Sequence, residues 1–576
     1  MGGRCYLDST MIIAPSTAPK PAPTGYPARW PLLLSATLTI LWFALLAQRP
    51  LYDPDEGRYA EIPREMLAGG DWVIPHLNGL VYLEKPPLQY WLTALTFGAF
   101  GQSEFTARLW TGLSGYCSLC LVFLVGRRLW GMRAGFKALL LTLASTLFVL
   151  LGHQLTLDMV LSTCLLASLA CFLMAESEVS STGDRSRRAR VWMLGCWTAM
   201  ALAVMTKGLI GALIPAATLV LYALWQRDFK VFRRLNTRWG LPLFALIAGP
   251  WFAMAARANS AFLQFFFVRE HFQRFFTPVE HRTEPWWFFA PVLAVGVLPW
   301  LPQALRAFAL PLRLMPPRSS PRRPPFDPAR LIWSWCSFVL IFFSTSNAKL
   351  ITYILPVIPA LALLCAVPSA HDHSRRDLSI GALLSLASCL GVLAYASGIW
   401  SSVAGRALAA ELAPMLLGTA LVLALASAGC LLWVRRNRVD AALNALCCGW
   451  FLATATVLVA ANGAQRLFSS KDAAIALRAV APESAKVFSV QTYEQSFTFY
   501  LGRPVILVDY HDEFTLGLTQ NPERGIASLD EFSQRWRALP EGYALMPYAT
   551  RDHLLSKGLP MRELAHFPTT VLMSRR

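Results

Sequence analysis

Charged residues are scarce in this chain. Of its 576 residues, 15% are charged and 55% are hydrophobic, and the 34 acidic residues are outnumbered by 52 basic residues. A composition so poor in charge excludes an ordinary soluble globular protein and predicts a polytopic membrane protein. The net charge of +18 does not indicate a nucleic-acid partner, because basic clusters between apolar runs are typical of cytoplasmic loops.

Cysteine is missing from the loops and the C-terminal region that we expect on the outer side of the membrane. All of the 12 Cys except Cys5 lie within apolar runs, so nothing indicates a disulfide-stapled exterior domain. Cys117 and Cys120 form a CxxC pair inside a predicted span, without the second pair that a zinc site needs. Residues 1–30 lack the pattern of a cleavable signal peptide. Residues 462–576 lack a Gly-rich phosphate loop, and we expect no nucleotide cofactor.

About thirteen apolar runs are long enough to cross a membrane. Basic clusters lie between them at 127–137, 185–190, 227–238, 318–330, 375–376 and 435–438. Because short cytoplasmic loops are enriched in Lys and Arg, we expect these clusters on the cytoplasmic side of the membrane. With the N-terminus inside, we expect spans near 31–47, 105–126, 136–154, 157–177, 191–206, 208–225, 239–257, 286–305, 331–346, 350–367, 378–399, 413–434 and 440–461. A further span at 86–101 would invert every later basic loop. We therefore interpret that run as an interfacial helix.

Three regions follow from this topology. They are a cytoplasmic tail (1–30), a membrane domain (31–461) with a periplasmic first loop (48–104), and a periplasmic domain (462–576). In the last region, helical patterns alternate with short apolar strands, which predicts a soluble α/β domain with a support or recognition role. The expected helices are 471–482, 492–502 and 528–539, and the expected strands are 486–490, 504–510 and 542–548.

Ionisable residues gather at the outer ends of the predicted spans. Such groups are costly at membrane depth, and they usually face a cavity or pair with one another. Helix capping or snorkelling would explain one of them, but six segments together favour a common polar cavity. The residues are Asp53, Asp55, Glu56, Arg58, Tyr59, Glu61, Arg64, Glu65, Glu84, Lys85, Asp158, Lys207, Glu270, His271, Arg274, His281, Arg282, Lys349 and Tyr353.

Acids beside Lys, Arg and Tyr suit the chemistry of a lipid-linked sugar phosphate. Basic residues and Tyr hydroxyls bind phosphate. Carboxylates bind a divalent cation, act as a base, or stabilise positive charge on an anomeric carbon. Glycosyl transfer is therefore the best chemical fit, and a lipid transporter that uses the same cations is the alternative.

Several motifs carry a resemblance to a known family. They are "DPDEGRYAEIPREM" and "YLEKPPLQYW" in the first loop, then "LTLDMVL", "MTKGLIGALIP", "EHFQRF" and "SNAKLITYILP". Their order and detail resemble the bacterial aminoarabinose transferases of lipid A modification. These are polytopic GT-C glycosyltransferases related to protein O-mannosyltransferases. The resemblance covers most of the chain from about residue 30 to 370.

The resemblance implies transfer of 4-amino-4-deoxy-L-arabinose from undecaprenyl phosphate to lipid A phosphates, at the periplasmic face of the bacterial inner membrane. It implies resistance to polymyxin and other cationic antimicrobial peptides. A GT-C protein or glycan mannosyltransferase remains the alternative. By resemblance, Asp55 is the first-loop acid, with Asp158 and Glu84 as its acidic companions. The candidates for binding the lipid phosphate are Lys85, Arg58, Tyr59, Tyr82, Lys207, Lys349 and Tyr353.

Two further interpretations concern acidic residues. A divalent metal ion, zinc or magnesium, would be held by Glu84 with His271 or Asp158. Glu56, Glu61, Arg64 and Glu65 stand at helical spacing, and we interpret them as ion pairs that support a surface helix.

Overall fold

The computed structural model describes residues 29–182, 186–273, 284–313, 326–368, 375–398 and 403–575. The chain forms two compact units, Met1–Trp42 and Phe43–Arg576. In the first unit the described residues belong to helix α1 (Arg29–Ala44), which has an apolar sequence. The other elements belong to the second unit, and the apolar stretch Ala36–Ala47 begins in the first.

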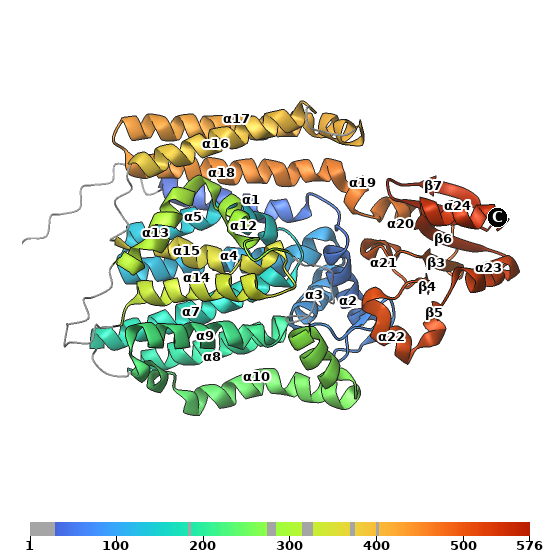
Figure 1. The fold of residues 1–576 in the computed structure, drawn as a ribbon, viewed down its shortest axis with the longest axis horizontal. Helices are drawn as coiled ribbons and strands as arrows, with labels where there is room; N and C mark the ends of the chain where they lie inside the picture. Colours follow the sequence, from blue (N-terminus) through green and yellow to red (C-terminus); the bar gives the residue numbers. More distant parts are fainter. Residues whose placement is uncertain are drawn as a thin grey trace, which may run out of the picture. The chain divides into compact units, whose positions relative to one another are not determined.

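Long apolar helices form most of the second unit. Among the described residues, eight helices are long and apolar enough to cross a membrane. They are α4 (Glu104–Trp130), α7 (Leu157–Thr182), α8 (Arg187–Lys207), α10 (Thr237–Ala258), α14 (Pro328–Thr345), α16 (Arg375–Ala396), α17 (Val403–Arg435) and α18 (Val439–Ala460). Helices α16, α17 and α18 lie side by side (Figure 1). The expected polytopic helical fold is confirmed.

Two bent helix pairs provide further candidate spans. In one, α5 (Met132–Leu143) meets α6 (Thr146–Gly152) with a bend of 72°. In the other, α12 (Phe289–Gly296) meets the segment formed by η4 (Leu298–Trp300) and α13 (Leu301–Arg313), with a bend of 85°. Lys137, which we expected in a basic loop, lies within α5, where its buried ammonium donates to the Cys365 carbonyl.

Three shorter apolar helices, Ala36–Ala47, Ile210–Gln226 and Ile351–Cys365, coincide with the remaining expected spans. Each expected span therefore falls on a helix or a helix pair. By length and composition, the described residues contain eight to ten crossings, so a total of thirteen stays a prediction. The remaining helical segments between the long helices are η1 (Leu45–Ala47), η2 (Phe229–Arg234), α9 (Ile210–Gln226), η3 (Gln264–Gln273), η5 (Ile351–Ile354) and α15 (Val357–Cys365).

The first loop is folded. It contains α2 (Asp55–Gly69), a hairpin of β1 (His76–Leu77) and β2 (Leu80–Val81), and α3 (Leu88–Phe100). Helix α2 ends at Gly70, whose φ of 72° is the left-handed conformation that closes helices. The hairpin turns at Asn78 and Gly79, both with positive φ, as a two-residue turn requires. At 13 residues, α3 is about 20 Å long and too short to cross the hydrocarbon core.

The C-terminal region contains a six-stranded mixed sheet with helices packed around it. The strand order is β5-β4-β3-β6-β8-β7, and the first four of these are parallel to one another. The strands are β3 (Lys486–Val490), β4 (Ile506–Val508), β5 (Gly525–Ile526), β6 (Gly542–Pro547), β7 (Arg562–His566) and β8 (Thr570–Ser574). The helical segments are η7 (Ala461–Ala464), α19 (Gln465–Phe468), α20 (Lys471–Arg478), α21 (Gln495–Leu501), η8 (Asp512–Phe514), α22 (Thr515–Gln520), η9 (Pro522–Arg524), α23 (Leu529–Ala538) and α24 (Tyr548–Ser556). The predicted α/β domain is confirmed.

The first loop and the C-terminal region share one hydrophobic core. Met66 and Phe97 belong to the same buried cluster as Phe497 and Phe499. The backbones of α2 and α21 approach so closely that a Cβ on Gly57 would lie 2.3 Å from the Ser496 nitrogen. Glycine is therefore required at this position. The C-terminal region therefore packs closely against the first loop, which carries most of the expected site residues.

Candidate active site

A cavity of about 710 Å³ lies where the first loop, the membrane helices and the C-terminal region meet. It brings together most of the residues that we expected to act in catalysis or to bind the lipid phosphate. Eight of the expected site residues line it: Asp55, Arg58, Tyr59, Glu84, Lys85, Asp158, Lys207 and Tyr353. The expected common polar cavity is therefore present in the structure.

Helix α2 presents its first turn to this cavity. Asp55, Arg58 and Tyr59 have the i, i+3, i+4 spacing that places side chains on one helix face. The Asp55 carboxylate is 41% exposed, and its Oδ1 lies 3.6 Å from Arg58 Nη1. The Nε of Arg58 is buried and has no hydrogen-bond partner among the described residues. The Nη atoms of Arg58, and not this shielded Nε, lie near the acids Asp55 and Glu513.

Tyr59 and Tyr82 remain neutral hydroxyl groups. Burial raises the pKa of each phenol above its ordinary value. Tyr59 stacks on Tyr90 with ring centroids 6.1 Å apart. Tyr82 does not line the cavity, but its hydroxyl donates to Glu84 Oε2 at 3.0 Å and so fixes a carboxylate that does.

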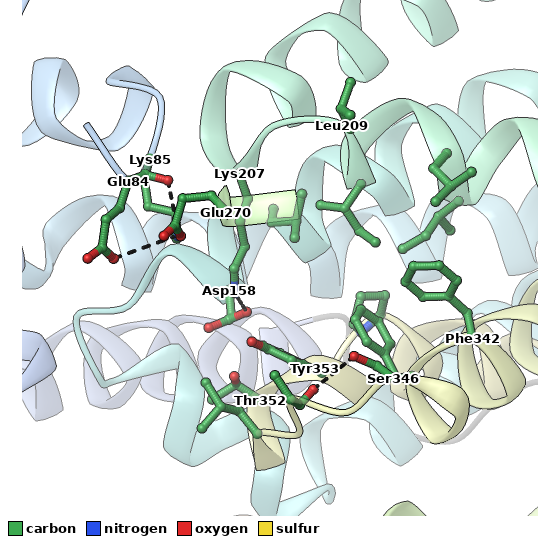
Figure 2. Close-up of a pocket in the computed structure, with 18 of the residues that line it drawn as sticks. Glu84, Lys85, Asp158, Lys207, Leu209, Glu270, Phe342, Ser346, Thr352 and Tyr353 are labelled. Atoms are coloured by element: carbon green, nitrogen blue, oxygen red, sulfur yellow. Dashed lines mark hydrogen bonds and ion pairs between the residues drawn. The ribbon is translucent and has the colours of Figure 1, made fainter. Parts of the chain in front are cut away.

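Lys85 lies between two carboxylates. Its ammonium is 2.9 Å from Glu270 Oε2 and 4.0 Å from Glu84 Oε2 (Figure 2). Its side chain is 12% exposed and that of Glu270 is 5% exposed. The partly desolvated pair holds the ammonium at the cavity wall, because a buried charge without a partner is costly.

A second lysine is fixed in the same manner. Lys207, the last residue of α8, lies 2.5 Å from Asp158 Oδ1, and Asp158 is in the first turn of α7. Its ammonium also lies 4.9 Å from the centre of the Tyr353 ring. Lys349 does not line the cavity. It donates to the Ser346 and Glu284 carbonyls at 2.6 and 2.9 Å, and Ser346 is a cavity residue.

The cavity has an apolar wall as well as a charged one. Leu209, Leu213 and Ile214 contribute from α9 and the residue before it, and Phe342 and Phe343 contribute from α14. Figure 2 shows Leu209 and Phe342 on one side and Glu84, Lys85 and Glu270 on the other, with Asp158 and Lys207 between them. The cavity therefore suits a ligand with a charged head and a hydrocarbon tail.

The interpretation of Glu56 as part of a surface helix is wrong. Its side chain is fully buried and accepts hydrogen bonds from Arg108 at 2.7 and 2.8 Å and from Arg49. Its Oε1 also accepts from the Leu155 N–H at 2.8 Å. Burial alone would raise the pKa of Glu56, but the charges of Arg108 and Arg49 lower it below the ordinary value.

The same correction applies to the next turn of α2. Glu61 is 0% exposed and Arg64 is 8% exposed. Arg64 Nε donates to Glu61 Oε2 at 2.6 Å, and Arg64 Nη1 donates to the Gly502 carbonyl at 3.1 Å. These residues do form an ion pair. The C-terminal region covers this part of the helix, however, and Arg64 joins the two through its bond to Gly502.

Two acidic residues of the cavity, Asp512 and Glu513 of η8, were not among the predicted site residues. The Glu513 carboxylate lies 3.4 Å from Arg58 Nη2. Both follow β4, and the carboxyl ends of parallel strands are a frequent location of binding residues. That signal is present in the sequence, but it does not say that this edge of the sheet faces the first loop.

The described residues contain no group of three or more metal-ligating side chains. Glu84 is in the cavity, where the Tyr82 hydroxyl binds it, and Asp158 is bound by Lys207. The side chain of His271 lies outside the described residues. The metal ion stays a prediction, and no step of the chemistry below is assigned to it.

Two family models match the chain. The model of the dolichyl-phosphate-mannose-protein mannosyltransferases matches residues 31–266. The model of the aminoarabinose transferase C-terminal domain matches residues 473–575. The first match covers α2, α3 and the helices up to the π-helix η3, and the second covers the mixed sheet.

Curated relatives show the same likeness. The undecaprenyl phosphate-alpha-4-amino-4-deoxy-L-arabinose arabinosyl transferase 1 of Sodalis glossinidius is 33% identical over 390 residues, which are 65% of this chain and 66% of that protein. The corresponding transferase of Erwinia tasmaniensis is 33% identical over 373 residues, 64% of each chain. The match thus spans just under two thirds of the length of these relatives.

One solved structure resembles nearly the whole chain. ArnT from Cupriavidus metallidurans, bound to undecaprenyl phosphate, is 32% identical with a TM-score of 0.86, and the likeness covers 96% of this chain and 99% of that one. Together with the amphipathic cavity, these likenesses place the chain in the class of polytopic membrane glycosyltransferases that use lipid-linked sugars. The likeness to ArnT extends through both the membrane helices and the C-terminal sheet. The chain belongs to the ArnT family of aminoarabinose transferases.

Proposed function

We propose that this protein transfers 4-amino-4-deoxy-L-arabinose from undecaprenyl phosphate to the phosphate groups of lipid A. The observation that carries the proposal is the cavity, which joins three cations to an apolar wall of α9 and α14. An amphipathic donor with a phosphate between a sugar and a long hydrocarbon matches both walls. The relatives named above act on this donor by name, and one is solved with the lipid phosphate bound.

The donor phosphate would be bound by Arg58 and Lys85, with Lys207 as the third cation of the cavity. Each cation is already held by a carboxylate, namely Glu513, Glu270 and Asp158 respectively. Such pairs fix the positions of the donors before the ligand arrives. Arg58 lines the cavity, and its guanidinium group would donate charge-assisted hydrogen bonds to a phosphate oxygen.

In the transfer step, a lipid A phosphate oxygen forms a bond to the anomeric carbon while the bond from that carbon to the donor phosphate breaks. Positive charge develops on the sugar, and the departing undecaprenyl phosphate gains one negative charge. Asp55, at the exposed end of α2, is placed to stabilise the positive charge. Arg58 and Lys85 would stabilise the leaving phosphate, and their contribution increases as the bond breaks.

The acceptor decides whether a base is needed. A phosphate of lipid A is already ionised near neutral pH, so it can attack without losing a proton. A Ser or Thr hydroxyl is a poor nucleophile and needs a base. The match to the protein mannosyltransferase model makes a hydroxyl acceptor the second candidate function. Asp55 would then act as the base, and transfer to a hydroxyl peptide in place of lipid A would identify that case.

The chain is a multi-pass membrane protein with bacterial relatives. We place it in the bacterial inner membrane with the active site on the periplasmic side. The support is the alternation of basic clusters with apolar helices, since short cytoplasmic loops are enriched in Lys and Arg. Single Cys residues at positions 55 and 520 should then react with an impermeant thiol reagent from the periplasm. Labelling of these positions only after cytoplasmic access would contradict the topology.

The experiment that tests the function is the mass of lipid A from cells with and without the protein. Cells that make the donor lipid should add aminoarabinose to lipid A and resist polymyxin, because the added amine lowers the negative charge that cationic peptides bind. Asp55→Asn, at equal membrane abundance, should lose both effects. Unmodified lipid A in cells with abundant parent protein and donor would refute the proposal.

A further inference from the structure

The C-terminal region supplies one wall of the cavity through the short segment η8 (Asp512–Phe514). This wall is well anchored. The Phe514 ring is 1% exposed and packs edge to face on Tyr493 at 4.8 Å. The Glu513 carboxylate accepts from Gln495 and Tyr510 and pairs with Arg58 at 3.4 Å. The two residues that follow Asp512 therefore hold it beside the cavity.

Carboxylates outnumber cations on the cavity walls. The described lining residues include six carboxylates, of Asp55, Glu84, Asp158, Glu270, Asp512 and Glu513, and three cations, of Arg58, Lys85 and Lys207. A cavity that bound only a phosphate would gain nothing from an excess of negative charge. The excess is understandable if the ligand also carries a positive charge.

One of these carboxylates differs from the others in its partners. Glu513, Glu270 and Asp158 each pair with a cavity cation, Asp55 lies 3.6 Å from Arg58, and Glu84 accepts from Tyr82. Within the part of the chain that the structure describes, the Asp512 side chain makes no ion pair or hydrogen bond, and it is exposed to the cavity. It is thus the acid that the phosphate-binding cations do not hold.

We propose that Asp512 binds the ammonium group of the donor sugar and determines the preference for an amino sugar. This inference rests on the proposed function, which supplies a donor with an amine on C4 and a phosphate on C1. These two atoms are at opposite corners of the sugar ring. The amine therefore points away from the phosphate and its cations, and it needs a carboxylate that those cations leave available. Glu513 is the positioning residue of the same segment, because it holds Arg58 rather than the sugar.

The test compares two donors with purified full-length protein in lipid bilayers. One is undecaprenyl phosphate carrying the amino sugar, and the other carries L-arabinose, in which a hydroxyl replaces the amine. The measured quantity is the ratio of kcat/KM for the two donors. We expect the parent to prefer the amino sugar by about tenfold or more, as one charge-assisted hydrogen bond provides. Asp512→Asn should reduce that ratio about tenfold, chiefly through KM for the amino sugar.

Three matched variants separate recognition from folding. Asp512→Glu keeps the charge and should retain part of the preference. Glu513→Gln should raise KM for both donors through Arg58 and leave their ratio unchanged. Glu523→Gln changes an exposed acid of the same region that does not line the cavity, and both rates should stay at the parent level.

An unchanged ratio in an active Asp512→Asn protein would overturn the proposal. The same holds if Glu523→Gln lowered the ratio as much, because the effect would then come from general surface charge. If the parent transferred neither sugar to lipid A, the proposed function would be wrong and this inference with it. Transfer of the amino sugar by a parent protein without any donor preference would refute the inference alone.

Discussion

Asp55 and Glu56 are adjacent on α2, yet they lie in opposite surroundings. The Asp55 side chain is 41% exposed and faces the cavity, with one cation 3.6 Å away. The Glu56 side chain is fully buried and accepts six hydrogen bonds, from Arg49, Arg108, and the Tyr52 and Leu155 amides. A loop crowded with charge therefore contains two sets of charges, one that folds the loop and one that faces the ligand.

The buried charges around Glu56 have a structural role. Arg108 belongs to α4, and Leu155 lies in the segment just before α7, three residues before Asp158. Glu56 therefore ties α2 to α4 and to the start of α7. That tie fixes Asp55 and Asp158 relative to each other. A buried carboxylate is stable only with full pairing, and here two Arg provide it. An exposed carboxylate at the cavity has no such requirement and remains available for chemistry.

The largest effect is expected for Glu56→Ala. Removal of the carboxylate leaves the Arg49 and Arg108 guanidinium groups buried without their partner, which costs about 3 to 5 kcal/mol. We expect a strong loss of folded protein and of thermal stability in detergent, measured by unfolding of the purified protein. An unfolding midpoint equal to that of the parent would show that the network is not structural.

Asp55→Asn should reduce activity and leave stability unchanged. Its side chain is partly exposed and its single ion contact is long, so the unfolding midpoint should stay at the parent value. Activity should fall about 100-fold to 1,000-fold, the range seen when one group that stabilises transition-state charge is removed. Full activity, or destabilisation equal to that of Glu56→Ala, would remove the distinction between the two acids.

Lys85→Ala and Arg58→Ala each remove one of the cations that line the cavity. Each should raise KM for the donor lipid by about 10-fold to 150-fold, since charge-assisted bonds to phosphate contribute about 1.5 to 3 kcal/mol. Lys85→Arg is the matched control, because it keeps a charge beside Glu270. Normal donor kinetics in a well-folded double variant would mean that both cations are only structural.

The smallest effect concerns Asp53, at the contact between the first loop and α21. Its carboxylate accepts from the Ser496 N–H and hydroxyl at 2.5 and 2.6 Å. Burial, together with the nearby charge of Glu494, raises the pKa of Asp53 to about 7. The folded state thus holds a proton that the unfolded state releases above about pH 4. The stability contributed by the protonated group is therefore lost as the pH rises from about 4 through 7.

Asp53→Asn removes this titration. The unfolding midpoint of the parent, relative to that of the variant, should fall between pH 5 and pH 8. A difference that stays constant over this range, or that increases with pH, would contradict the raised pKa of Asp53.

Much of the fold could be predicted from the sequence because it depends on local patterns. The apolar runs marked the membrane helices, and the run 486–490 coincides with β3 (Lys486–Val490). The helix expected at 492–502 corresponds to α21, and Gly502 closes it with a φ of 78°. Strand β7 was missed because its residues are mostly exposed and show no apolar alternation.

The candidate site could be predicted only in part. The motif residues of the first loop and of α7 and α8 meet in one cavity, as expected. The sequence could not show that Asp55 is partly exposed while Glu56 is buried. Glu56 is buried against Arg108, which lies 52 residues away along the chain. Asp512 and Glu513 were missed because their role depends on how the C-terminal sheet docks on α2.

The most direct test is transfer with purified components. The parent protein and Asp55→Asn would be reconstituted in the same lipid bilayer with the undecaprenyl phosphate donor and lipid A, and the mass of the lipid A product measured. The account predicts lipid A carrying aminoarabinose with the parent and unmodified lipid A with Asp55→Asn, at equal unfolding midpoints. Unmodified lipid A with a folded parent, or equal modification by both proteins, would contradict it.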